Sequence, residues 1–72
     1  MAVYKKITLV GTSENTIEEA VERALERASR TIRNISWFEV KEIRGSVAEG
    51  RLKEYQVVLE VGFRVEGDTE LA

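Results

Sequence analysis

The feature that most constrains the fold is a period of two within residues 52–65, where every second residue from 55 to 65 is apolar. Successive side chains of a β-strand point to opposite faces, so a period of two predicts a strand with one apolar face. That face comprises Tyr55, Val57, Leu59, Val61, Phe63 and Val65. Because an apolar face of this size must be covered by another layer, the rest of the chain has to supply one.

One amphipathic helix, predicted from about residue 16 to residue 34, supplies that layer. Its apolar residues follow the spacing of a single helix face, and charged residues fill the opposite face. The apolar stripe comprises Ile17, Ala20, Val21, Ala24, Leu25, Ala28 and Ile32. Thr16 and Glu19 have the spacing of a capping box at the helix start. A helix of this extent is about 28 Å long, and we interpret its charged face as solvated surface.

Two further strands complete the predicted fold. Residues 36–47 again show a period of two, and residues 48–51 have the length of a hairpin turn. Residues 3–10 form a first strand that ends at Gly11. A helical crossover makes the first and second strands run the same way, so the most apolar third strand lies between them. We therefore predict an α+β fold of β-α-β-β type, with one helix on a three-stranded antiparallel sheet of order 1-3-2, as a single domain over residues 1–72.

Composition excludes several classes of site. The chain contains no cysteine and no histidine, which excludes disulfides, thiol nucleophiles, Cys/His zinc sites and histidine-based acid–base catalysis. Eleven Lys and Arg against 13 Asp and Glu give a net charge of −2, which argues against a nucleic-acid partner. No apolar run approaches the ~20 residues of a membrane span, and the start lacks the pattern of a secretion signal. We therefore expect a cytoplasmic protein that binds neither nucleic acid nor membrane.

Size and strand length both predict a homo-oligomer. Domains below roughly 80 residues usually need a disulfide, a metal or a partner for stability, and the composition leaves only the partner. The hairpin is also too long for its helix, since about 15 Å of it extends past the helix end. Such an arm either frays or is buried by a neighbouring chain.

The predicted pairing of the hairpin places a tryptophan on the uncovered face of the sheet. A turn at Glu49 and Gly50 sets Phe38 opposite Val61, Val40 opposite Leu59, and Trp37 opposite Gly62. If Phe38 and Val40 join the core under the helix, then Trp37 points away from it. The uncovered face is predicted to hold Trp37, Ile43, Gln56, Val58 and Gly62, with Leu52 and Arg64 near its ends. A partly apolar surface of this kind indicates a subunit interface or a ligand platform.

The residues alone leave the role of this surface open. Trp37 is either an aromatic residue buried between subunits or a surface on which a ligand stacks. Gln56 is, on its own, an ordinary polar residue on a solvent-facing strand. Arginines such as Arg44 and Arg64 are more often rim charges or partners of carboxylates than clamps for a phosphate. No pair of carboxylates has the spacing of an acid–base site, so we do not expect an enzyme.

Three runs of the chain, taken in order, resemble the dodecins, a family of small flavin-binding proteins. These runs are residues 5–13, 37–45 and 53–63, and the likeness to bacterial dodecins extends over about residues 3–65. The resemblance implies a β-α-β-β subunit in a hollow shell of twelve subunits. It also implies pockets at two-fold axes that each hold a pair of flavins.

By position, the resemblance places Trp37 against the isoalloxazine ring and Gln56 at the pyrimidine edge of the flavin. It places Arg44 and Arg64 near the phosphate-bearing tail of FMN, or near coenzyme A bound elsewhere on the shell. An electron-rich indole stacks well on an electron-poor tricycle, and an amide offers one donor and one acceptor side by side. Trp37 and Gln56 are roughly 20 Å apart on one sheet, so the pocket is expected to combine residues of at least two chains.

We therefore expect a storage or buffering protein that sequesters FMN, or riboflavin or FAD, and quenches the photochemistry of the bound flavin without turnover. The alternative is a module that binds coenzyme A or serves assembly alone. In that case Trp37 only fills a contact between subunits.

Overall fold

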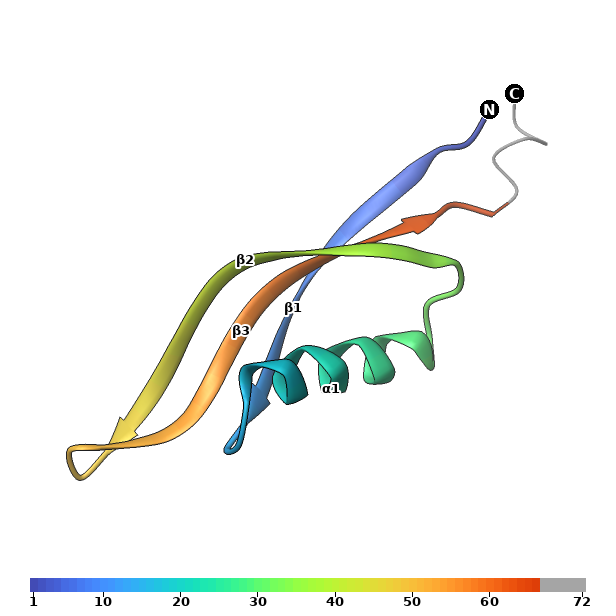
Figure 1. The fold of residues 1–72 in the computed structure, drawn as a ribbon. Coiled ribbons are helices and arrows are strands. Elements are labelled where there is room, and N and C mark those ends of the chain that lie inside the picture. Colours follow the sequence, from blue (N-terminus) through green and yellow to red (C-terminus); the bar gives the residue numbers. More distant parts are fainter. Residues whose placement is uncertain (67–72) are drawn as a thin grey trace.

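The computed structural model describes residues 1–66, which form one helix packed on a three-stranded sheet (Figure 1). Strand β1 (Tyr4–Ser13) is followed by helix α1 (Ile17–Ser29), and strands β2 (Ile35–Ala48) and β3 (Arg51–Arg64) form a hairpin. β3 lies between β1 and β2 and is antiparallel to both. The predicted α+β fold and the strand order 1-3-2 are confirmed.

Helix α1 begins where its cap residue predicts. The Thr16 hydroxyl accepts a hydrogen bond from the Glu19 backbone N–H at 2.9 Å, which satisfies one of the donors left free at a helix N-terminus. The Glu19 carboxylate does not complete a capping box, because it accepts hydrogen bonds from the Ser13 hydroxyl and the Asn15 amide. The buried Ser13 hydroxyl accepts the Thr16 N–H instead, at 3.2 Å. The end of β1 therefore caps the helix that follows it.

The helix ends earlier than the apolar stripe predicts, so the prediction that it reaches residue 34 was wrong. Ser29 is its last residue, and Asn34 adopts a φ of 66° where the chain turns into β2. The Arg64 backbone N–H donates to the Asn34 carbonyl at 3.1 Å and fixes this reversal on the end of β3. With 13 residues, α1 is about 20 Å long. The hairpin therefore extends even farther past the helix than predicted (Figure 1).

The core is narrow because α1 lies very close to the sheet. Its buried residues are Ala20, Ala24 and Ala28 on the helix and Val57, Leu59 and Val61 on β3. Gly11 allows this approach, because a Cβ there would lie 2.9 Å from the Ala20 carbonyl carbon and closer still to its oxygen. The interpretation of Gly11 as a strand end was wrong, since β1 continues to Ser13. Small residues on both elements set the distance between the helix and the sheet.

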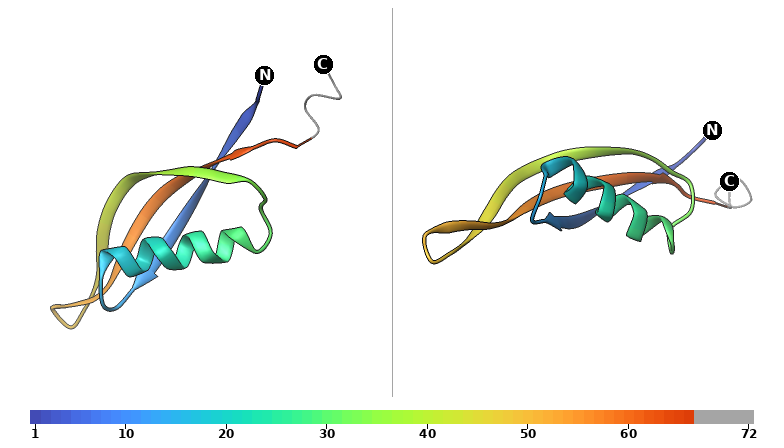
Figure 2. Two further views of the ribbon diagram at one scale, coloured as in Figure 1. Left: turned by 45° about the vertical axis from the view of Figure 1, so that its right-hand side comes forward. Right: turned by 60° about the horizontal axis from the view of Figure 1, so that its bottom comes forward.

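Helix α1 packs on β1 and β3 and lies on one side of the sheet (Figure 2). Phe38 and Val40 lie on the helix side of β2, opposite Val61 and Leu59. They nevertheless remain 45% and 44% exposed, so the prediction that they join the core under the helix was wrong. A short helix cannot cover a third strand at the far edge of the sheet. The chain therefore leaves an apolar strip on β2 without cover of its own.

The subunit is unusually elongated for its length. It measures 55 × 19 × 14 Å, with a radius of gyration of 15.1 Å. A compact chain of 72 residues has a radius of gyration of about 11 Å. The shape and the exposed strip on β2 both favour burial of this surface by further chains.

The hairpin turn has the conformation that the register requires. Glu49 and Gly50 have φ values of 54° and 76°, the pair of positive values typical of a type I′ turn. All the predicted pairs near the other end of the hairpin are present, namely Trp37 with Gly62, Phe38 with Val61, and Val40 with Leu59. The predicted register is confirmed for this part of β2.

Two β-bulges, one at Lys53 on β3 and one at Lys41 on β2, change the register in the middle of the hairpin. The pairing skips both residues, so between the bulges Ile43 lies opposite Val57 and Arg44 lies opposite Gln56. One extra residue on one strand moves every later side chain to the other face. The prediction that Ile43 lies on the uncovered face was therefore wrong, and Arg44 takes a place on that face beside Gln56.

Candidate functional site

The face of the sheet away from α1, which we call the open face, carries two groups of side chains. One group surrounds Trp37, since Trp37 and Lys6 both lie opposite Gly62. The other surrounds Gln56, which lies opposite Arg44. The two groups are six residues apart along β3, a distance of roughly 20 Å.

The indole of Trp37 lies against the backbone of Gly62. A Cβ at Gly62 would lie 2.6 Å from the indole Cη2 and closer still to Cε2 and Cζ2. Only a glycine leaves room for the ring in this position. The side of the ring that does not face Gly62 is partly open, since Trp37 is 37% exposed.

Tyr4 is a neighbour of the indole that the sequence analysis missed. Its ring centroid lies 5.2 Å from that of Trp37, with 53° between the ring planes, a tilted arrangement that aromatic pairs favour. The pairing of β1 with β3, which sets Tyr4 opposite Arg64, brings the two rings together. The indole is therefore partly covered by its own chain, although it lies on the face of the sheet away from α1.

The indole N–H donates to a cluster of three charged side chains, Lys6, Glu39 and Glu60, which we call the ionic group. This cluster was not predicted from the sequence. Trp37 Nε1 donates to Glu39 Oε2 at 3.1 Å. Lys6 Nζ contacts Glu39 Oε1 at 3.2 Å and Glu60 Oε1 at 3.1 Å. Glu39 is two residues after Trp37 on the same strand, and this spacing alone places both on one face.

These contacts shift the pKa values of Lys6 and Glu39 in the directions that keep both side chains charged. Hydrogen bonds to Glu60 and to Glu39 raise the pKa of Lys6. Hydrogen bonds from Lys6 and from Trp37 lower the pKa of Glu39. Glu39 is therefore a carboxylate beside the indole throughout the neutral range.

The second group fixes the orientation of the Gln56 side chain. Arg44 Nε donates to Gln56 Oε1 at 2.8 Å, and Gln56 Nε2 donates to Glu54 Oε2 at 3.1 Å. Arg44 also contacts Glu42 Oε1 through Nη1 at 3.4 Å. The amide thus has its acceptor toward a guanidinium and its donor toward a carboxylate. Arg44 and Gln56 were predicted as separate site residues, and the shifted register between the two bulges brings them into contact.

Arg64 belongs to neither of these contacts. It is exposed near the end of β3, two residues beyond Gly62, and lies opposite Tyr4. The structure therefore places Arg64 near Trp37 and places Arg44 beside Gln56. The four predicted site residues do not form one cluster within a single chain.

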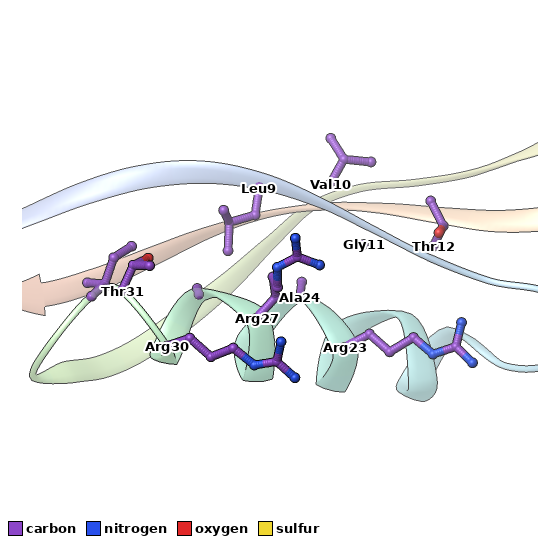
Figure 3. A pocket seen from close by; sticks show the side chains of 11 residues that line it. Leu9, Val10, Gly11, Thr12, Arg23, Ala24, Arg27, Arg30 and Thr31 are labelled. Atoms are coloured by element: carbon purple, nitrogen blue, oxygen red, sulfur yellow. The ribbon is translucent and has the colours of Figure 1, made fainter.

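A separate groove of about 500 Å³ lies between β1 and α1 (Figure 3). Leu9, Ala24 and Ala28 contribute apolar surface to it, together with other residues of both elements. Arg23, Arg27 and Arg30 line it from the helix, and Arg27 extends toward β1. None of the predicted site residues lines this groove. These arginines belong to the charged face of α1, which was interpreted from the sequence as solvated surface.

Two further features of the described residues bear on function. Residues 1–66 contain no group of three or more acidic, histidine or cysteine residues that could hold a metal ion. In the same residues, no helix has the length and apolar character that a membrane crossing demands.

The chain is similar to known proteins over most of its length. The Dodecin family model matches residues 3–66. A dodecin of Thermus thermophilus is 64% identical over 64 residues, which cover 89% of this chain and 93% of that protein. The structure of a dodecin from Streptomyces coelicolor is 42% identical and has a TM-score of 0.87, covering 90% of this chain and 93% of that one. A calcium dodecin from Mycobacterium tuberculosis is 33% identical with a TM-score of 0.80 and the same coverage.

Proposed function

The chain belongs to the dodecin family, and from this premise we propose that it binds FMN, or riboflavin or FAD, and stores the flavin without turnover. The proposal gives Trp37 the role of the stacking surface and Gln56 that of the partner of the pyrimidine edge. Arg44 and Arg64 supply positive charge for a phosphate-bearing tail. The cytoplasmic location and the single domain over residues 1–72 stay predictions from the sequence.

The observation that carries the proposal is that the Trp37 indole is fixed in position and partly exposed. The ring lies against Gly62 and is partly open on the face of the sheet that α1 does not cover. An aromatic side chain fixed in this way loses little conformational entropy when a planar ligand stacks on it. Stacking contributes about 0.5–1.5 kcal/mol beyond the burial of apolar area.

The spacing of the site residues supports a pocket shared between subunits. Trp37 and Gln56 are roughly 20 Å apart on one sheet, which is too far for one tricyclic ring to contact both. A second chain must therefore bring its own Gln56 or Trp37 to the ring. The exposed strip on β2 and the elongated shape provide surface for such contacts. We propose that the subunits form a closed homo-oligomer, a dodecamer as the family resemblance implies.

The residues near Trp37 support storage and quenching over catalysis. Lys6 and Glu39 contact each other in an ion pair, and the chain contains no histidine or cysteine. An excited flavin takes one electron from the indole and then returns it, so light energy is lost without a net reaction. This cycle needs a stacked aromatic donor and no acid, base or nucleophile.

Titration of FMN with the protein tests the flavin proposal. Binding should quench the green emission of FMN at micromolar protein. Trp37→Ala should preserve the assembly, measured by light scattering, and should lose most of the affinity and quenching. Thr8→Ala, on the same face but outside the contacts that the indole makes with Gly62, Tyr4 and Glu39, is the matched control and should bind as the wild type does. Wild-type protein that leaves FMN emission unchanged refutes the proposal.

The groove between β1 and α1 favours coenzyme A binding as a second candidate function. Its three guanidinium groups match a polyanion, and its apolar floor matches a thin uncharged arm. Calorimetric titration with coenzyme A should show binding that Arg27→Ala weakens. Arg33→Ala, which removes an exposed arginine paired with Glu66 outside this groove, should leave it unchanged. Equal effects of the two substitutions would refute a site in the groove.

If the protein serves assembly alone and binds no ligand, calorimetry should show no heat of binding with coenzyme A, and the protein should not quench the emission of FMN.

A further inference from the structure

We propose that Glu39 is a positioning residue for Trp37, whose carboxylate fixes the indole through its N–H and makes the ring a better electron donor. The effect on the indole is a property of the protein without ligand. The consequence for a bound flavin rests on the function proposed above.

The geometry gives the Glu39 carboxylate two different partners, one on each oxygen. The indole Nε1 donates to Oε2 at 3.1 Å, and Lys6 Nζ lies 3.2 Å from Oε1. Together with the contact to Gly62, the hydrogen bond leaves the indole little freedom to rotate or slide. Gly62 fixes the position of the ring and Glu39 fixes its orientation.

The other charged side chains of the ionic group hold the Glu39 carboxylate beside the indole. Glu39 lies directly opposite Glu60 on β3, a pair of like charges that destabilises a sheet by itself. Lys6 reaches across from β1 and contacts both carboxylates, and Lys41 on β2 lies 3.8 Å from Glu39. As exposed ion pairs these contacts contribute little to stability. Their clear structural consequence is a carboxylate held in place beside the indole.

A carboxylate at this position favours loss of an electron from the ring. Electron transfer to an excited flavin leaves an indole cation radical and a flavin anion radical. The carboxylate stabilises the cation by charge, and the hydrogen bond strengthens as the N–H becomes more acidic. Return of the electron restores both rings, so no bond forms or breaks and no other reactant is consumed.

The hydrogen bond between the indole and Glu39 can be tested without flavin, because Trp37 is the only tryptophan of the chain. Ultraviolet resonance Raman spectra contain an indole band that reports hydrogen bonding at the N–H. In flavin-free protein, Glu39→Gln and Glu39→Val should shift this band toward a weaker hydrogen bond. Glu60→Gln is the matched control, because it removes a carboxylate from the same ionic group that does not contact the indole, and it should keep the wild-type band.

The pH dependence separates this role from a purely structural one. The groups that face Glu39 are Lys6, Lys41, Glu60 and the indole itself. In the wild type and in Glu60→Gln, the indole band should change in the acid range, below the ordinary pKa of a glutamate, as Glu39 takes up a proton. In Glu39→Gln this transition should be absent. Circular dichroism should confirm that each variant is folded.

The flavin measurement then tests the consequence. Glu39→Val should bind FMN about tenfold more weakly, the scale of a hydrogen bond to a charged group, and FMN bound to Glu39→Gln should emit severalfold more than in Glu60→Gln. A wild-type band typical of a free N–H, or equal shifts in Glu39→Gln and Glu60→Gln, overturns the positioning role. A shifted band with unchanged quenching overturns the effect on electron donation. If the wild type does not bind FMN, the proposed function fails, whereas the Raman result still decides the positioning of the indole.

Discussion

Gly62→Ala tests whether the position of the indole determines flavin binding. A Cβ at this residue would lie 2.6 Å from the Trp37 Cη2 and closer still to two other ring atoms. An ordinary contact between carbon atoms needs about 3.5 Å, so the ring must retreat by at least about 0.9 Å. Because Trp37 is 37% exposed, the ring can move outward without moving the backbone. This movement breaks the fit that Gly62 and Glu39 impose on the ring.

The expected effects on stability and on binding differ in size. Overpacking costs about 1–3 kcal/mol, whereas replacing glycine by alanine in a strand returns roughly 0.5–1 kcal/mol through the unfolded chain. The free energy of unfolding should therefore fall by no more than about 2.5 kcal/mol. Loss of well-aligned stacking removes about 0.5–1.5 kcal/mol of binding, which weakens FMN affinity about two- to tenfold.

Thermal unfolding of the flavin-free protein and titration of FMN emission measure these two effects. Gly45→Ala is the matched control, because its Cβ would meet the Leu52 side chain at 3.0 Å and the Glu54 carbonyl oxygen at 3.1 Å, away from Trp37. It should alter stability by a similar amount and leave FMN affinity unchanged. If Gly62→Ala binds and quenches FMN as the wild type does, the position of the ring does not control binding and the reasoning is refuted.

Three further predictions concern the fold. Glu49→Asn should raise the free energy of unfolding by about 0.5–1 kcal/mol, because Glu49 has a φ of 54° and asparagine tolerates the left-handed region better; an unchanged melting temperature would contradict this. Thr16→Ala should cost about 1 kcal/mol by removing the helix cap, whereas Thr31→Ala, beyond the helix, should cost less. Acidification should destabilise the protein, because hydrogen bonds from Ser13 and Asn15 lower the pKa of Glu19, as those from Lys6 and Trp37 lower that of Glu39. Their contributions are present above the unfolded pKa of a glutamate and are lost as the pH falls through the folded values; in Glu19→Gln the loss measured by acid unfolding should be smaller.

Local patterns were enough to predict the parts of the fold that depend on periodicity. The alternation in β3 predicted its central place, and the turn at Glu49 and Gly50 predicted the pairing of Trp37 with Gly62. These predictions succeed because hairpin register follows from turn geometry and strand parity, and because the bulges at Lys53 on β3 and Lys41 on β2 offset each other before the pairing reaches Trp37. The extent of α1 was overestimated, since the apolar stripe continues to Ile32 while the chain must already turn to reach β2.

The site was predictable only in part. The resemblance to dodecins named Trp37, Gln56, Arg44 and Arg64. It did not predict that Arg44 contacts Gln56, because the two bulges that set their register leave no periodic signal. A bulge is set by how β2 bends along β3, and such bending depends on the whole sheet.

The sequence by itself determined the order of the strands and the helix, which strand is central, and that Trp37 lies on the side of the sheet away from the helix. These follow from interactions between residues close in the chain, so their patterns can be counted. Only the tertiary structure decided that Tyr4 and Glu39 contact the indole, that Lys6 joins two carboxylates, and that α1 leaves β2 uncovered. Those contacts join residues brought together by the packing of whole elements, where distances of a few ångströms depend on every side chain between them.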